Sequence, residues 1–137
     1  MDTTNWYKHL IKPSWAPPEW LFGPVWSVLY IIIFVSFGAV FYSVLTKEIS
    51  WLVALPFILN LLFNFAFTPL QFGAKSNFLA AIDILLIVST LLWAFYSIWN
   101  SPVNLQWIVY VNIPYLLWGS YATGLQLTIT YLNRKYA

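Results

Sequence analysis

The chain contains no cysteine and a single histidine, and only 7% of its 137 residues are charged. Without cysteine, disulfides, thiol catalysis and thiolate metal sites are excluded, and one histidine excludes a multi-histidine metal site. A soluble domain carries roughly 25% charged residues, so this sequence cannot build a water-exposed surface. The formal net charge of +2 is too small and too scattered to indicate nucleic-acid binding.

The apolar residues, which make up 61% of the sequence, gather into four long runs. The runs cover residues 21–45, 51–69, 78–99 and 103–131. Each is about as long as a helix that crosses a membrane, which takes about 20 residues. The connections are short, so consecutive helices must run antiparallel. The sequence therefore predicts an all-α polytopic membrane helix bundle with four transmembrane helices, in a single integral-membrane domain over residues 1–137.

A tryptophan- and proline-rich segment precedes the first run and continues into it. Its prolines, at positions 13, 17 and 18, remove backbone donors and push the preceding residues toward extended conformations. The segment also contains four tryptophans: Trp6, Trp15, Trp20 and Trp26. Tryptophan gathers at membrane–water interfaces because its ring is apolar while its N–H group needs a partner. We expect residues 1–20 to form an interfacial loop over the mouth of the bundle.

The basic residues are distributed unevenly between the two sides of the predicted bundle. One side carries Lys8, Lys12, Lys75, Arg134 and Lys135, and only Lys47 lies on the other. Cytoplasmic loops carry the excess of lysine and arginine in membrane proteins. This bias predicts that both termini and the interfacial loop are cytoplasmic.

Several polar side chains lie inside the apolar runs, where each must find a partner or line a cavity. Asp83 is the only acidic or basic residue well inside a run. Asn60 and Asn64 share one face of the second helix, and Ser27 and Tyr30 share a face of the first. The last run carries a polar and aromatic stripe: Asn112, Tyr115, Trp118, Ala122 and Gln126. Together these faces can line an interior pocket.

A purely structural interpretation of the same residues is also open. Asparagine, glutamine and serine in membrane helices often bond only to a neighbouring helix, for about 0.6 kcal/mol each. Asp83 lies toward the N-terminal end of its helix, where the helix dipole favours a negative charge. Most of the tryptophans suit interfacial anchoring, although Trp26 and Trp118 lie inside their runs and suit it less.

No familiar catalytic constellation is present in the sequence. It contains no histidine-based triad, no paired carboxylates, no metal cluster and no glycine-rich phosphate loop. Any chemistry would have to come from tryptophan or from the ligand itself.

Four motifs carry a resemblance to a known family. Trp6 to Tyr30 reads WY-x2-L-x-KPSW-x-PP-x-W-x2-GPVW-x2-LY, and Asn64 to Lys75 reads N-x-A-x2-P-x2-FGAK. Further along come an aspartate patch at residues 83–86 and PYLLW at 114–118, followed by Ala122 and Leu125. These motifs resemble the TspO/MBR family of tryptophan-rich sensory proteins, translocator proteins and peripheral benzodiazepine receptors. The resemblance covers nearly the whole chain.

The resemblance implies a small α-helical membrane protein, often a homodimer, with a ligand pocket that opens toward the cytoplasm. The implied ligands are protoporphyrin IX, haem-type tetrapyrroles, sterols or other hydrophobic small molecules, none bound covalently. The other partner would be the lipid bilayer, with no nucleic acid, and the implied location is a bacterial plasma membrane. Some bacterial members are associated with light-dependent porphyrin breakdown, in which the residues matching Trp26 and Trp118 would be catalytic.

Motifs and polar faces together predict one set of ligand-binding residues. They are Trp15, Phe22, Gly23, Trp26, Tyr30, Asn60, Asn64, Asp83, Leu86, Tyr115, Trp118, Ala122 and Gln126.

The sequence departs from the family pattern at several points. The family has five spanning helices, and its first precedes the WY motif, whereas only Met1 to Asn5 precede that motif here. Either this is a four-helix form or the start was placed too late. Gln126 stands where the family usually has asparagine. Leu127 stands where the animal sterol motif has tyrosine, which weakens a sterol role. Phe65 and Phe67 replace commoner tryptophans and lose their N–H donors.

The leading functional hypothesis is a membrane receptor or sensor that binds porphyrin-type ligands inside the bundle. Flat tetrapyrrole rings suit an aromatic-lined cavity through stacking and apolar burial. An enzymatic hypothesis adds light-dependent porphyrin degradation beside Trp26 and Trp118. A third hypothesis is a small transporter of porphyrins or hydrophobic compounds, in which Asp83 would couple uptake to protons.

Overall fold

The computed structural model describes residues 10–70, 74, 76–101 and 104–133. Within these residues every regular element is helical, as the sequence predicts for an all-α membrane bundle. The elements are the 3-10 turn η1 (Glu19–Leu21) and the helices α2 (Phe22–Leu45), α3 (Trp51–Thr68), α4 (Asn77–Trp99), α5 (Trp107–Val111) and α6 (Ile113–Leu132). Several residues used in the sequence argument lie outside the described part: Trp6, Lys8, His9, Phe72, Gly73, Lys75, Arg134 and Lys135.

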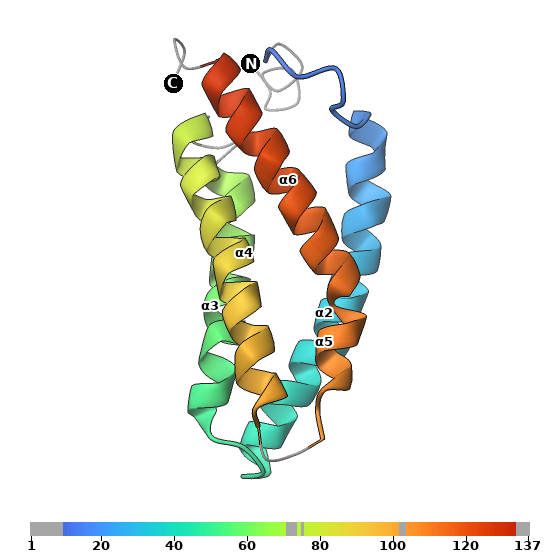
Figure 1. Ribbon diagram of the computed structural model, residues 1–137, viewed down its shortest axis with the longest axis vertical. Coiled ribbons are helices and arrows are strands. Elements are labelled where there is room, and N and C mark those ends of the chain that lie inside the picture. The colour runs from blue at the N-terminus through green and yellow to red at the C-terminus, as the bar shows by residue number, and fades with distance from the viewer. Residues whose placement is uncertain (1–9, 71–73, 75, 102–103, 134–137) are drawn as a thin grey trace.

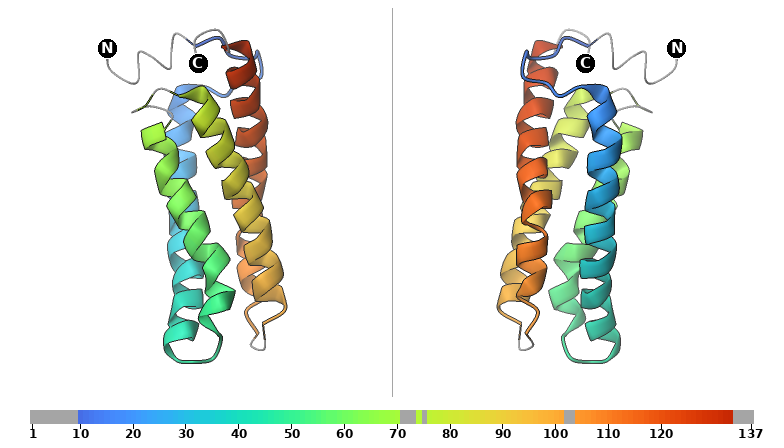
Figure 2. Two further views of the ribbon diagram at one scale, coloured as in Figure 1. Left: turned by 90° about the vertical axis from the view of Figure 1, so that its left-hand side faces the viewer. Right: turned by 90° about the vertical axis from the view of Figure 1, so that its right-hand side faces the viewer.

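Consecutive long helices run antiparallel along one axis, and α5 and α6 together form the fourth helical segment of the bundle (Figure 1). Helices α3 and α4 lie side by side, and α6 crosses the bundle obliquely (Figures 1 and 2). Residues 10–21 pass over one end of the bundle, from the C-terminal end of α6 to the start of α2. This segment therefore covers the end at which the predicted pocket would open.

Local chemistry explains where the helices begin. Ser50 caps α3 by accepting a hydrogen bond from the amide of Leu52 at 3.2 Å, and Ser76 caps α4 through the amide of Leu79 at 3.1 Å. The fourth apolar run is divided at Asn112, and Pro114 follows in the first turn of α6. Proline is tolerated there because the first amides of a helix have no partner within it. In the middle of a longer helix it would remove a backbone bond.

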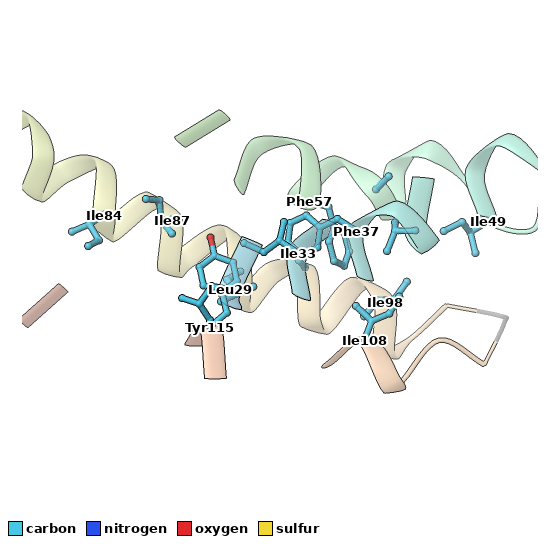
Figure 3. Close-up of a cluster of buried hydrophobic side chains, with 14 residues drawn as sticks. Leu29, Ile33, Phe37, Ile49, Phe57, Ile84, Ile87, Ile98, Ile108 and Tyr115 are labelled. Carbon is cyan, nitrogen blue, oxygen red and sulfur yellow. The ribbon is translucent and has the colours of Figure 1, made fainter. Parts of the chain in front are cut away.

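The core is apolar and concentrated in the half of the bundle away from residues 10–21. Phe37 of α2 and Phe57 of α3 meet edge to face with ring centroids 4.9 Å apart. Buried isoleucines and leucines of α2, α4 and α5 pack around this pair, and α6 contributes Tyr115 (Figure 3). Helices α4 and α6 pack against each other at Gly119, where an added Cβ would lie at van der Waals distance, 3.5 Å, from Val88 Cγ2.

The outer surface is apolar as well, which suits a lipid environment. Phe34 and Leu45 of α2 are each 82% exposed, and Tyr96 of α4 is 72% exposed. Helices α2 and α4 are each long and apolar enough to cross a membrane, and α3 is apolar but shorter. Large apolar side chains on the outside of a protein are stable when lipid surrounds them. We therefore describe the chain as an integral membrane protein.

One polar contact joins α2 to the junction between α5 and α6. Asn112 donates to Ser36 Oγ at 2.9 Å and to the carbonyl oxygen of Ile108 at 2.8 Å. Both Asn112 and Ser36 are fully buried. The contact links α2 to Asn112, the residue at which α5 ends and α6 begins.

Candidate functional site

A chain of hydrogen bonds crosses the bundle and involves all of its long helices. Tyr30 of α2 donates to Asn64 Oδ1 at 3.1 Å, and Asn64 of α3 donates to the Tyr115 hydroxyl of α6 at 2.9 Å. Tyr115 then donates to Asn60 Oδ1 at 2.8 Å. Asn60 donates to Thr90 Oγ1 at 3.2 Å and to a backbone carbonyl of α4 at 2.8 Å. Four predicted site residues therefore form one polar network.

The network provides hydrogen-bond partners for polar side chains whose burial inside a membrane would otherwise cost free energy. Tyr115 and Asn60 are fully buried, and Asn64 is nearly so. A buried donor or acceptor without a partner costs about 1–3 kcal/mol. The structural role that the sequence left open for the two asparagines is thus realised, and their side chains link α3 to α4 and α6.

Two other predicted residues carry buried polar atoms that have no hydrogen-bond partner in the described structure. They are the Asp83 Oδ2 of α4 and the Trp118 Nε1 of α6, and Asn112 Oδ1 at the junction of α5 and α6 is a third such atom. The first can only accept when it is ionised, and the second can only donate. Unsatisfied buried groups in a native fold call for an explanation, and an absent ligand or water is one. Both atoms are therefore the most informative polar atoms of the candidate site.

An apolar groove of about 690 Å³ lies between α2 and α6. Its lining comes from the end of residues 10–21, which we call the interfacial segment, from the first two turns of α2 and from the first half of α6. The residues are Pro17, Leu21, Pro24, Val25, Val28, Leu29, Pro114, Leu117, Trp118 and Tyr121. Pockets for small molecules commonly have volumes of about 300–1,000 Å³ and mostly apolar walls. The groove therefore has the size and the surface of a binding site for a large apolar molecule.

Aromatic rings surround Trp118 at this groove. The Trp118 ring meets Phe22 at a centroid distance of 5.9 Å and Tyr121 at 5.7 Å. Tyr121 also meets Trp15 edge to face at 5.7 Å. Trp15, Phe22 and Trp118 are among the predicted site residues, and the structure brings them to one side of the bundle.

The remaining predicted residues are spread more widely. Trp26 is partly buried and faces Tyr30 on its own helix at 5.5 Å. Gly23 is exposed, and a Cβ added to it would have no neighbour within 4 Å. Leu86 is 39% exposed. Ala122 packs against the core cluster, and Gln126 donates to the carbonyl oxygen of Asn77 at 3.3 Å and to Thr130 Oγ1 at 3.2 Å.

The interfacial segment is fastened to α6 by side chains that no sequence motif singles out. Asn133 accepts a bond from the Ile11 amide at 3.0 Å and donates to the Ile11 carbonyl at 2.8 Å. Tyr121 donates to the carbonyl oxygen of Trp15 at 2.6 Å. These bonds hold Ile11 against the C-terminal end of α6 and Trp15 against the middle of that helix. The interfacial segment, held in this way, closes one end of the groove through Pro17 and Leu21.

We predict that Asn133→Ala will release the Ile11 end of this segment without unfolding the bundle. The substitution removes both bonds to Ile11, each of which contributes about 1 kcal/mol. Hydrogen exchange at the Ile11 amide should become faster than in the wild type by about tenfold. Thr128→Ala is the matched control, because the Thr128 hydroxyl bonds only within its own helix. Unchanged exchange at Ile11 in the Asn133 variant would contradict the assignment.

Metal chemistry finds no support among the described residues. They contain no group of three or more histidine, cysteine, aspartate or glutamate side chains that could hold a metal ion.

Comparison with known proteins identifies related sequences over almost the whole chain. Residues 1–132 match the model of the TspO/MBR family. A tryptophan-rich protein TspO from Bacillus cereus is 39% identical over 131 residues, which cover 94% of this chain and 81% of that protein. A tryptophan-rich sensory protein from Cereibacter sphaeroides is 34% identical, with 94% and 77% covered. The human translocator protein is 33% identical, with 91% and 73% covered.

Proposed function

The chain belongs to the TspO/MBR family, a family of membrane sensors and receptors, and we propose that its own ligand is a porphyrin-type molecule bound between α2 and α6. The single observation that carries the proposal is the apolar groove of about 690 Å³ with Trp118 in its wall. A porphyrin is a large, flat and mainly apolar molecule. It buries its faces best against aromatic and branched apolar side chains.

The groove offers complementary surfaces on its two sides. Val25, Val28 and Leu29 form an aliphatic wall on α2, whereas Trp118 and Tyr121 form an aromatic wall on α6. An aromatic ligand gains about 0.5–1.5 kcal/mol from a well-oriented ring contact beyond the burial of its area. A flat ring between these walls would gain both kinds of contact at once.

The polar edge of the ligand can be met at the end covered by the interfacial segment. Porphyrin propionates are anionic and remain near water, so they would point toward residues 10–21. Lys12 contributes a positive charge to this segment. The ligand would therefore lie with its apolar edge toward the middle of the membrane.

The proposal is tested by titrating protoporphyrin IX into the purified protein in nanodiscs and following porphyrin absorbance in the dark. We expect saturable binding with one porphyrin per bundle. Protein-free nanodiscs correct for partition of the porphyrin into lipid. A linear signal that equals the protein-free control at every concentration would overturn the proposal.

Illumination of the saturated complex then distinguishes a receptor from a degradative enzyme. A receptor leaves the porphyrin absorbance at its dark value, whereas an enzyme consumes the porphyrin only when the protein is present. We propose the receptor role, because Trp118 lines the groove whereas Trp26 is not among its lining residues. Protein-dependent loss of porphyrin under light that disappears in Trp118→Phe would favour the enzyme instead.

A further inference from the structure

Asp83 is the only aspartate, glutamate, lysine, arginine or histidine in the helices α2 to α6. Its side chain is 4% exposed, and its Oδ2 has no hydrogen-bond partner among the described residues. It lies beyond the first turn of α4, which begins at Asn77. The helix dipole acts mainly within that first turn, so the dipole does not account for a carboxyl group at this depth.

The polar neighbours of Asp83 already use their hydrogens elsewhere. Tyr30 and Tyr115 lie in the same polar region and donate their single hydroxyl hydrogens to asparagine side chains. Asn60 uses both of its amide hydrogens on α4. The facing helices carry no side chain that could serve as a counter-charge. A counter-charge for an ionised Asp83 must therefore come from outside the helices.

We propose that Asp83 recognises a lipophilic amine, with the protonated nitrogen against its carboxylate and the apolar part of the molecule among the surrounding leucines. An unpaired carboxylate inside a membrane is costly, and such residues usually mark a ligand or ion path. An organic ammonium group supplies charge and several N–H donors in one contact. A metal ion would need more carboxylate or imidazole ligands than the described residues bring together.

The surroundings of Asp83 reach the surface within one helical turn. Leu79 and Leu86, which precede and follow it on α4, are 44% and 39% exposed. Tyr30, on the facing helix α2, is 43% exposed. An amine can therefore approach with its hydrocarbon part against apolar side chains. Asp83 does not line the groove between α2 and α6, so the inference does not depend on porphyrin binding.

The test uses two fluorescent probes that differ only at one end. Dansylcadaverine ends in a protonated amine, and N-hexyl dansylamide ends in a methyl group in its place. Energy transfer from the protein's tryptophans to the dansyl group measures binding in nanodiscs, with protein-free discs as the blank. Because a charge-assisted hydrogen bond contributes about 1.5–3 kcal/mol, we expect the wild type to prefer the amine by about tenfold to a hundredfold.

The variant Asp83→Asn keeps the shape of the side chain and removes its charge. We expect it to bind the amine about tenfold or more weakly, at the affinity of the methyl-terminated probe, whose own binding stays unchanged. Thermal unfolding and far-UV circular dichroism report whether the variant is folded. The proposal is wrong if wild-type protein binds the two probes equally, a comparison that needs no variant. It is equally wrong if a folded Asp83→Asn protein keeps the preference for the amine.

Discussion

Tyr115→Phe is expected to lower the free energy of unfolding by about 1–2 kcal/mol, because the variant loses two buried hydrogen bonds. The Tyr115 hydroxyl accepts from Asn64 at 2.9 Å and donates to Asn60 at 2.8 Å. Phenylalanine keeps the ring in the core, but the Asn64 amide group then loses its acceptor and Asn60 Oδ1 loses its donor. Because these groups are buried, water cannot replace the lost bonds.

Thermal or denaturant unfolding in a defined detergent measures this effect. Tyr96→Phe is the control, because Tyr96 lies on α4 with 72% of its surface exposed. Exposed substitutions of this kind usually change stability by less than about 0.5 kcal/mol. If the two variants unfold alike, the hydrogen-bond network does not hold the bundle together as described.

Trp118→Ala is expected to weaken protoporphyrin binding by about tenfold to a hundredfold. Trp118 forms part of the wall of the groove and meets both Phe22 and Tyr121. Alanine removes the flat surface against which the ligand would pack and leaves the two neighbouring rings without support. Porphyrin absorbance measures the affinity independently of the lost tryptophan fluorescence.

Two further variants separate the causes of this loss. Trp118→Phe keeps an aromatic surface and removes the N–H group, so a smaller loss assigns the effect to stacking. Trp93→Ala removes a tryptophan that is 44% exposed on α4, outside the groove, and should leave the affinity unchanged. Equal losses in the Trp93 and Trp118 variants would show that binding does not depend on the groove.

Periodicity and composition predict the helices and much of the polar interior. Asn60 and Asn64 share a helix face in the sequence, and both face Tyr115 in the structure. The prediction succeeds because a polar side chain inside an apolar run must find its hydrogen-bond partner within the bundle rather than in lipid. Asp83 stands out in the sequence for the same reason, because it is the only charged residue well inside an apolar run.

The boundaries of the groove could not be predicted in the same way. Val28 and Leu117 line the groove. In the sequence they are apolar residues within apolar runs, and nothing distinguishes them from the apolar residues of the same helices that face lipid. The contacts of Asn133 with Ile11 and of Tyr121 with Trp15 join residues more than 100 positions apart. No local pattern carries that information. The hydrogen bond of Asn112 to Ser36, where the fourth apolar run divides, is likewise a tertiary contact.

The most direct test of the account is the structure of the protein with protoporphyrin IX bound in nanodiscs. The account predicts ring density between α2 and α6, in van der Waals contact with Val28, Leu117 and Trp118. Ring density on the outer surface of α3 or α4, with the groove filled by lipid at saturating porphyrin, would contradict it.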